Sequence, residues 1–366
     1  MQHSPFRQSS LSQLTYPIIQ APMAGISTPA LAAAVSNAGG LGSLGIGASS
    51  LEHAHAMIRQ TQQLTTQPFN VNVFCHQPAQ RDAYSESRWI AYMTPLFAEL
   101  GAQPPATLAE PYPSFLANEP LFALMCQLRP AVVSFHFGIP PRDWIDRFNA
   151  LGIYTMATAT NLDEAQLIAH AGIKSVIAQG IEAGGHRGMF DPTLPDACQS
   201  TLDLVKQLAQ HLSIPIVAAG GLMNGHDIQR AQAYGATAAQ LGTAFLLCPE
   251  AGTSVAHRAH LRTTHATALT AGISGRPARG LINRLIQHVT HIDAPAPPAY
   301  PVAYDLAKHL ANQAPHQVEA YAAHWAGTHV AHIREYPAAE LMRILVNEWH
   351  HAQRQADKGP SSLGNA

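Results

Sequence analysis

Charged residues are scarce in this sequence: Asp, Glu, Lys and Arg make up 12% of 366 residues, and the formal net charge at pH 7 is −2. A chain with so little excess charge creates no field that would collect a nucleic acid or an anionic membrane surface. Apolar runs of about 18 residues, the length of a spanning helix, are also missing. Residues 1–14 are polar and lack the apolar segment of a signal peptide. We therefore expect a cytoplasmic protein without a nucleic-acid or membrane partner.

Cysteine is also rare. The four cysteines lie far apart, at positions 75, 126, 198 and 248, and none forms a CxxC pair. This spacing argues against a zinc knuckle and provides no disulfide framework. Histidine, in contrast, occurs 21 times, but no HExxH or comparable ligand spacing appears. We expect no metal site and interpret the histidines as solvated or core residues.

Short apolar strands alternate with helical stretches from residue 18 onward. The strand candidates are 18–23, 41–45, 69–74, 132–138, 154–161, 175–180, 215–221 and 238–246. The helix candidates are 29–37, 51–64, 115–128, 141–151, 163–171, 201–212 and 225–234. Strict alternation with right-handed crossovers produces either an open doubly wound sheet or a closed barrel. Eight units favour an α/β fold of the (β/α)8 TIM-barrel type.

Two stretches are too long to be ordinary connections of a barrel. The first follows the third strand, and the second, rich in proline near residues 294–298, follows the eighth. Together they predict a smaller, mostly helical substrate lobe over the barrel mouth. The predicted parts are the barrel (14–75 and 120–250), the lobe (76–119 and 251–335), a C-terminal helix packing back on the barrel (336–354) and a disordered tail (355–366).

One glycine pattern imitates a dinucleotide site. Residues 40–45 read Gly-Leu-Gly-Ser-Leu-Gly and match GxGxxG. The fingerprint requires a strand, then the glycine turn, then a helix, whereas here a helix precedes the glycines and a strand runs through them. We assign these glycines to a helix end and close packing.

The loop Gln179-Gly-Ile-Glu-Ala-Gly-Gly-His-Arg-Gly188 follows the sixth strand. Gly184 and Gly185 allow positive φ or a close approach of backbone to a ligand, and His186 stands next to them. Loops at the carboxyl ends of barrel strands carry the chemistry of this fold. An isolated Gly-Gly-His is a weak motif that also fits a surface turn, so its assignment depends on the rest of the chain.

A phosphate site is predicted at two neighbouring strand ends. Gly221 ends the seventh strand, and Gln240-Leu241-Gly242-Thr243 lies in the eighth, where barrels commonly bind phosphate. Backbone N–H groups and the Thr243 hydroxyl can hold a phosphate monoester without lysine. The rest of a mononucleotide would then lie across strand ends that carry Pro22, Met23, Asn72 and Gln179. Methionine can contact an aromatic ring, and the amides match the polar edge of a flavin, which indicates FMN.

Several motifs together resemble the nitronate monooxygenase family, formerly called 2-nitropropane dioxygenases, of the bacterial and fungal class I. They are residues 19–25 (IQAPMAG), 38–42 (AGGLG), 133–138 (VSFHFG), 179–188, 240–243, 274–280 (SGRPARG) and 300–302 (YPV). The resemblance implies FMN bound by Asn72, Gln179, Gly184, Gly221 and residues 240–243. It also implies His186 as the catalytic histidine. Asn70 stands where relatives usually have glycine.

The implied reaction is FMN-dependent oxidation of alkyl nitronates by O2 to a carbonyl compound and nitrite, through a flavin semiquinone. An unperturbed imidazole titrates near pH ~6.5, so His186 could also take the α-proton of a neutral nitroalkane. Tyr300, Tyr304 and Lys308 are spaced four apart, as on one helix face, and relatives close the site with such a face. His136, at the end of the fourth strand, would be a second histidine near the substrate.

Two alternatives stay open at the level of sequence. An FMN-dependent NAD(P)H enoyl or quinone reductase would share the barrel and the phosphate site, because nicotinamide can stack on flavin without a glycine fingerprint. A protein that binds FMN or a sugar phosphate without turnover is the other. The sequence does not decide the physiological substrate, the use of neutral nitroalkanes or the oligomeric state.

Overall fold

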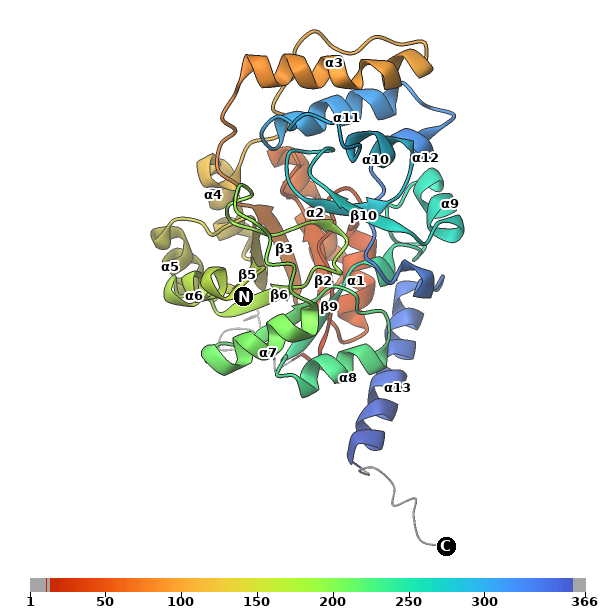
Figure 1. Cartoon of the computed structure of the whole chain (residues 1–366). Coiled ribbons are helices and arrows are strands. Elements are labelled where there is room, and N and C mark those ends of the chain that lie inside the picture. The colour runs from red at the N-terminus through yellow and green to blue at the C-terminus, as the bar shows by residue number, and fades with distance from the viewer. Residues whose placement is uncertain (1–10, 12–13, 358–366) are drawn as a thin grey trace, which may run out of the picture.

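The computed structural model describes residue 11 and residues 14–357. Predictions for the N-terminal residues and for positions 358–366 of the tail lie outside this described part. Eight parallel strands form the predicted barrel, with neighbours in the order β1-β9-β8-β6-β5-β4-β3-β2 (Figure 1). The ends of this sheet meet through the backbone of Leu41, which donates to the Ile18 carbonyl at 2.9 Å and accepts from the Gln20 N–H at 3.0 Å. The barrel fold is thereby confirmed.

The strands begin within one residue of the predicted positions, but most end two to five residues earlier than predicted. Their bounds are β1 Ile18–Gln20, β2 Gly42–Gly45, β3 Phe69–Phe74, β4 Val132–His136, β5 Tyr154–Ala159, β6 Ser175–Gln179, β8 Ile216–Ala219 and β9 Ala238–Leu241. The residues that were predicted as strand but lie outside the strands are mainly at the carboxyl ends. Backbone there leaves the sheet to line a cavity, which apolar composition alone does not reveal.

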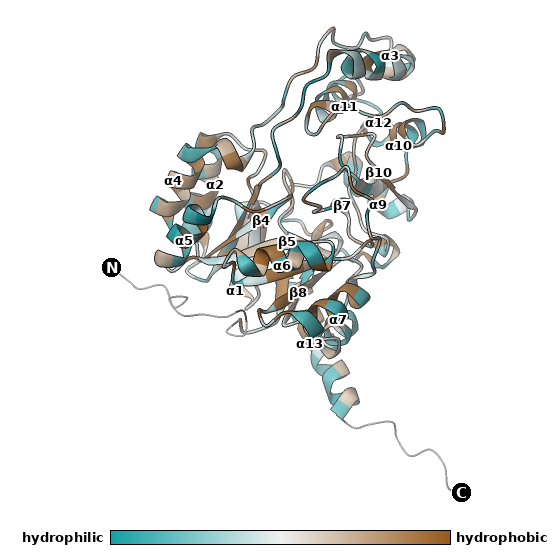
Figure 2. Cartoon of the chain, turned by 60° about the vertical axis from the view of Figure 1, so that its left-hand side comes forward, coloured by the Kyte–Doolittle hydropathy of each residue, from teal (hydrophilic) through white to brown (hydrophobic). Residues whose placement is uncertain are grey.

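The outer helices follow the prediction closely. They are α1 Pro29–Asn37, α2 Leu51–Leu64, α4 Glu119–Leu128, α5 Arg142–Ala150, α6 Leu162–His170, α7 Thr201–His211 and α8 Gly225–Ala233. A 3-10 turn, η3 Phe115–Ala117, precedes α4. Side-chain caps fix the starts: Thr28 Oγ1 accepts from the Leu31 N–H, and Asn161 Oδ1 accepts from the Glu164 N–H. Helices α5, α6 and α7 carry both hydrophilic and hydrophobic stretches (Figure 2), as expected for helices that cover a core.

Alternate strand residues build two cores. In β4, Val133 and Phe135 pack with the helix layer, whereas Val132 points into the barrel with Ile177 and Leu11. The glycines of residues 40–45 serve the first core, because a Cβ on Gly42 would lie 1.9 Å from the Ala32 carbonyl oxygen of α1. The assignment of that GxGxxG pattern to packing is confirmed.

The lobe lies over the carboxyl ends of the strands (Figure 1). Its helices are α3 Ala83–Glu99, α9 Val255–Thr263, α10 Arg284–Val289, α11 Val302–Asn312 and α12 Val318–Tyr321, with the 3-10 turn η5 Val330–His332. It also holds a three-stranded antiparallel sheet, β10 Thr267–Thr270, β11 Ala278–Leu281 and β7 Gly185–His186. The sequence predicted a mostly helical lobe without locating these strands, because strands of two to four residues leave no clear alternating pattern.

Helix α13, Ala338–Asp357, is the predicted C-terminal helix and packs against α1 and α8. It continues three residues beyond the predicted end at 354, so the prediction of disorder is wrong for residues 355–357. Within the described residues, no helix combines the length and apolar character needed to cross a lipid bilayer.

Candidate active site

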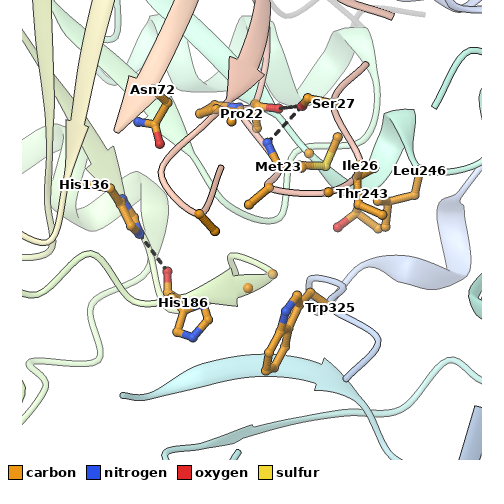
Figure 3. Close-up of a pocket in the computed structure, with 18 of the residues that line it drawn as sticks. Pro22, Met23, Ile26, Ser27, Asn72, His136, His186, Thr243, Leu246 and Trp325 are labelled. Carbon is orange, nitrogen blue, oxygen red and sulfur yellow. Dashed lines mark hydrogen bonds between the residues drawn. The ribbon is translucent and has the colours of Figure 1, made fainter. Parts of the chain in front are cut away.

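A cavity of about 950 Å³ lies at the barrel mouth, between the carboxyl ends of the strands and the lobe (Figure 3). Thirteen of the predicted site residues line it: Pro22, Met23, Asn72, His136, Gln179, Gly184, His186, Gly221, Gln240, Gly242, Thr243, Tyr304 and Lys308. Two do not. The Leu241 side chain is 1% exposed and packs in the core between strands and helices, so only its backbone could take part in the predicted cofactor site. Tyr300 stands behind the cavity wall.

The loop that carries His186 is fastened to both halves of the molecule. His186 pairs with Ala278 of β11, which joins the loop to the lobe sheet. Gly185 has φ +73°, and a Cβ on Gly184 would lie 2.5 Å from the carbonyl carbon of Ala326. Both glycines are therefore required by backbone geometry, as the sequence predicted.

A buried cation holds the same loop from the barrel side. The side chain of Arg187 is fully buried, pairs with Asp196 at 2.6 Å and donates to the carbonyl oxygens of Gln179 and Gly180, both at 2.8 Å. Gln179 contributes its amide: Oε1 accepts from the Gly188 N–H at 2.8 Å, and Nε2 donates to the His186 carbonyl oxygen at 2.9 Å. The Gln179 amide thus positions the loop as well as lining the cavity, a role that the sequence did not reveal.

His136 acts on the backbone of His186. Its Nε2 lies 3.2 Å from the His186 carbonyl oxygen, which can only accept, so Nε2 carries the proton (Figure 3). Nδ1 then accepts from Thr158 Oγ1 at 3.0 Å. Burial lowers the pKa of His136 to about 4. His136 is therefore neutral at pH 7, and both its nitrogens are occupied in positioning His186.

The His186 ring stands in an aromatic enclosure. Its centroid lies 5.2 Å from the ring of Trp325, 5.4 Å from Tyr300 and 5.7 Å from Phe137. Nε2 lies 2.8 Å from the buried hydroxyl of Ser274. Burial, followed by the charges of His136 and Arg276, lowers the pKa of His186 to about 3. The sequence-based expectation of an imidazole that titrates near its ordinary value is wrong, because the enclosure forms only in the folded chain.

The predicted face of two tyrosines and one lysine is only partly helical. Helix α11 begins at Val302, so Tyr304 and Lys308 share it, whereas Tyr300 precedes it. Tyr300 still belongs to the site, since its hydroxyl lies 2.9 Å from that of Tyr112. Lys308 Nζ lies 5.2 Å from the ring centroid of Tyr112 and 5.0 Å from that of Tyr304, which places a cation at the cavity wall.

The opposite side of the cavity is built from glycine backbone. Gly220 and Gly221 have φ +118° and +69° after β8, conformations that expose backbone to the cavity. A Cβ on Gly242 would lie 3.4 Å from the Ala21 Cβ, at the tight end of ordinary contact. Thr243 Oγ1 accepts from the Gly327 N–H at 2.9 Å, so this corner also joins barrel to lobe.

Two amides offer acceptors to a ligand. Gln240 Oε1 is buried and has no partner among the described residues, a costly state unless a ligand or water supplies a donor. Asn72 Nδ2 donates to the Ser134 hydroxyl at 2.9 Å, and its side chain points toward the cavity (Figure 3). Met23 lies beside them. Glycine backbone at one end and unpartnered amide oxygens along the side fit a ligand that has a phosphate and a flat ring with N–H donors.

Sequence reasoning missed five residues in and around this site: Tyr112, Phe137, Ser274, Arg276 and Trp325. Ser274 and Arg276 fall in the Ser-Gly-Arg-Pro-Ala-Arg-Gly stretch, which could have signalled them. Tyr112 appeared only as part of a proline-rich loop, and no local pattern marks Trp325. These residues come from segments far apart in sequence.

Three histidines of the lobe, His257, His260 and His324, are buried and in contact with one another. The rings of His257 and His324 stack at 4.5 Å, and Nδ1 atoms of His260 and His324 lie 3.0 Å apart. No group of His, Cys, Asp or Glu in the described part of the chain has an arrangement that could hold a metal ion. All three are buried, as interpreted, but His257 and His324 also line the cavity.

Comparison with known proteins bears on this site. Residues 7–348 match the family model described as nitronate monooxygenase. A nitronate monooxygenase of Pseudomonas aeruginosa is 51% identical over 345 residues, covering 93% of this chain and 98% of that protein. The crystal structure of a nitroalkane oxidase from Streptomyces ansochromogenes matches with a TM-score of 0.88 and 38% identity, over 95% of this chain and 100% of that one. The structure of FabK from Thermotoga maritima shares the fold, with a TM-score of 0.72 and 24% identity, over 95% of this chain and 97% of that one.

Proposed function

The chain belongs to the nitronate monooxygenase family and is an enzyme that oxidises nitronates; from this premise we propose that it uses FMN, held in the cavity at the barrel mouth beside His186. The observation that carries the proposal is the glycine-lined end of the cavity at β8 and β9, which faces the enclosed imidazole across a space of about 950 Å³. The predicted cytoplasmic location stays a prediction.

The residues present fit FMN. Backbone N–H groups near Gly221 and Gly242, with the Thr243 hydroxyl, would hold the phosphate. The unpartnered Gln240 Oε1 and the amide of Asn72 would meet the polar edge of the ring. When bound, FMN supplies the redox chemistry, accepting electrons from the nitronate for transfer to O2.

The chain's own groups bind and orient the substrate. Lys308 provides a positive charge at the cavity wall, and Tyr304 provides a hydroxyl on the same helix face. Both suit the negative oxygens of a nitronate. The rings of Phe137, Tyr300 and Trp325 pack around His186 and leave it only partly exposed, toward the cavity.

His186 is the proton acceptor that a neutral nitroalkane would need. Its pKa of about 3 makes it a weak base, so deprotonation of a carbon acid is slow at this position. A nitronate has already lost that proton. We therefore infer that nitronates are the preferred substrates and that neutral nitroalkanes react more slowly.

The reductase alternative rests on the shared fold alone, because the FabK match is below one quarter in identity. Anaerobic mixing of the flavin-loaded protein with propyl-2-nitronate, and separately with NADH and NADPH, separates the two functions. We expect nitronate to change the flavin absorbance and both nicotinamides to leave it unchanged. Rapid bleaching of the flavin by a nicotinamide alone would contradict the proposed nitronate oxidation. A purified protein without flavin would contradict the proposed use of FMN.

Substitution of His186 tests its role separately. We expect His186→Asn to retain FMN and to oxidise propyl-2-nitronate, but to lose most of its activity on neutral 2-nitropropane, by roughly 10²-fold or more, the usual contribution of a general base. Equal activity of variant and parent on the neutral substrate would show that the base lies elsewhere.

A further inference from the structure

Arg276 is a buried cation without a carboxylate partner. It is 3% exposed and lies in the segment between β10 and β11. Its guanidinium donates to the carbonyl oxygens of Met189, at 2.6 Å, and Phe190, at 3.4 Å. No ion pair to Arg276 exists within the described residues, whereas the neighbouring Arg187 is paired with Asp196. Burial lowers the pKa of Arg276 to about 10, so it remains charged at pH 7.

The position of this charge relates it to the substrate cavity. The Arg276 Cζ lies 4.5 Å from the ring centroid of Phe137 and 5.6 Å from that of Tyr300. The same two rings also contact His186. Phe137 and Tyr300 therefore form an aromatic layer that both the guanidinium and the imidazole contact, and Arg276 itself does not line the cavity.

A charge in such a place acts over a longer distance than one at the surface. Water does not screen it, and the effective dielectric constant of the ring layer is low. A buried cation without a directly paired carboxylate is also costly. An anionic ligand in the cavity would offset part of that cost, whereas a neutral ligand would not. The acidic groups whose charges act on Arg276 are Asp191, which is exposed, and Glu164, whose oxygens accept from Thr160 and Phe190.

We propose that Arg276 is the fixed positive charge that makes the cavity favour an anionic nitronate over the neutral nitroalkane, acting through the layer of Phe137 and Tyr300. This inference rests on the proposed function of the same site. Lys308 supplies a second cation at the cavity wall and is exposed, whereas Arg276 is buried and held by two carbonyl oxygens. Arg276 does not touch the substrate and affects its binding by charge alone.

The test compares Arg276→Gln, which removes the charge but keeps a donor for the Met189 carbonyl, with Arg276→Lys, which keeps the charge. For Arg276→Gln we expect the KM for propyl-2-nitronate to rise about tenfold, as for a charge interaction at an effective dielectric constant of about 20, while the KM for neutral 2-nitropropane stays within about twofold. Arg276→Lys should restore most of the preference. Arg88→Gln, on the outer helix α3, is the control for loss of one positive charge.

Two readouts do not need turnover. Inorganic nitrate, a small planar anion, should bind Arg276→Gln about tenfold more weakly than the parent in calorimetric titration of the flavin-loaded protein. The charge of Arg276 also lowers the pKa of His186, so Arg276→Gln should raise that pKa, as measured by NMR titration of the imidazole without substrate. If the parent binds nitrate but oxidises no nitronate, the proposed function fails and the charge assignment stands.

Unchanged nitronate KM and nitrate affinity in folded Arg276→Gln would overturn the proposal, as would equal losses for the anionic and neutral substrates. If Arg276→Gln does not fold, the variant Asp191→Asn tests the same proposal. This exposed substitution removes a negative charge that opposes Arg276 and retains the Oδ1 acceptor for the Thr193 N–H. It should tighten nitrate binding measurably, and no change or a weakening would contradict the proposal.

Discussion

At the scale of single residues, the hydrogen bonds of His186 decide which of its nitrogens is free. The Ser274 hydroxyl lies 3.2 Å from the Arg276 carbonyl oxygen, which can only accept, and 2.8 Å from His186 Nε2. When the hydroxyl donates to that carbonyl, Nε2 must carry a proton and donate to Ser274. Nδ1 is then the unprotonated nitrogen. Ser274 thus acts as a positioning residue that keeps one imidazole nitrogen available as an acceptor.

Removal of this hydroxyl should therefore affect proton transfer more than flavin binding. For Ser274→Ala we expect kcat with neutral 2-nitropropane to fall roughly ten- to a hundredfold, while propyl-2-nitronate, which needs no deprotonation, loses less than about threefold. Steady-state kinetics at matched flavin content measures both. Ser87→Ala, on the exposed side of α3, is the matched control. Equal losses on both substrates would point to a structural role only.

The depressed pKa of His186 has a direct consequence for the pH profile. Its imidazole is neutral above about pH 3, so it does not change protonation near pH 6.5. We expect kcat/KM for propyl-2-nitronate, measured from pH 5.5 to 8 by initial rates on rapid dilution, to show no limb that His186→Asn removes. A limb near pH 6.5 that disappears in that variant would show that the imidazole titrates normally.

At the scale of elements, the sequence predicts the strands and helices well because each carries a local signal. Phe69–Phe74 and Pro29–Asn37 were predicted with their observed bounds; the strand contains β-branched residues, and the helix begins with a proline that follows the capping Thr28. The sequence placed Tyr300 on a helix because Tyr300, Tyr304 and Lys308 are spaced four apart. The helix begins only at Val302, after Pro301, so Tyr300 precedes it. The pairing of His186 with Ala278 is long-range and has no local signal.

Two glycines in similar patterns should respond differently to alanine. Gly42→Ala would place Cβ 1.9 Å from a backbone oxygen of α1, so we expect a loss of several kcal/mol in stability or no soluble protein. In Gly242→Ala the nearest atom is 3.4 Å away, so the fold should survive. That methyl group projects at the proposed phosphate site and should weaken FMN binding. Thermal unfolding and FMN titration distinguish these outcomes; a stable Gly42→Ala would contradict the packing assignment.

At the scale of the whole molecule, buried neutral histidines link stability to pH. The pKa values of His76, His257 and His324 are lowered by burial to about 4, 4 and 3. The unfolded chain takes up protons on these residues below pH ~6.5, whereas the folded chain does not. Their contribution is fully present above pH ~6.5 and is lost as the pH falls toward their folded pKa values.

We therefore expect steep acid destabilisation, up to about 1.4 kcal/mol for each such histidine per pH unit below 6.5. Urea unfolding at pH 7.5, 6.5 and 5.5 measures it. His76 offers a specific control because neither ring nitrogen has a partner in the described structure, so His76→Phe removes no hydrogen bond there. This variant should show a shallower dependence on pH, and a parent equally stable at pH 7.5 and 5.5 would refute the expectation.

The segments that form the cavity walls are synthesised at different times. The glycine backbone near Gly221 and Gly242 exists once the first 250 residues have been made, but His329 meets Gly221, Thr243 meets Gly327 and α3 meets α11 only when the C-terminal third has followed. A chain emerging from the ribosome N-terminus first therefore presents an open barrel mouth, and the aromatic enclosure of His186 closes last. The C-terminal third of the chain thus completes both the glycine corner and the shielding of His186.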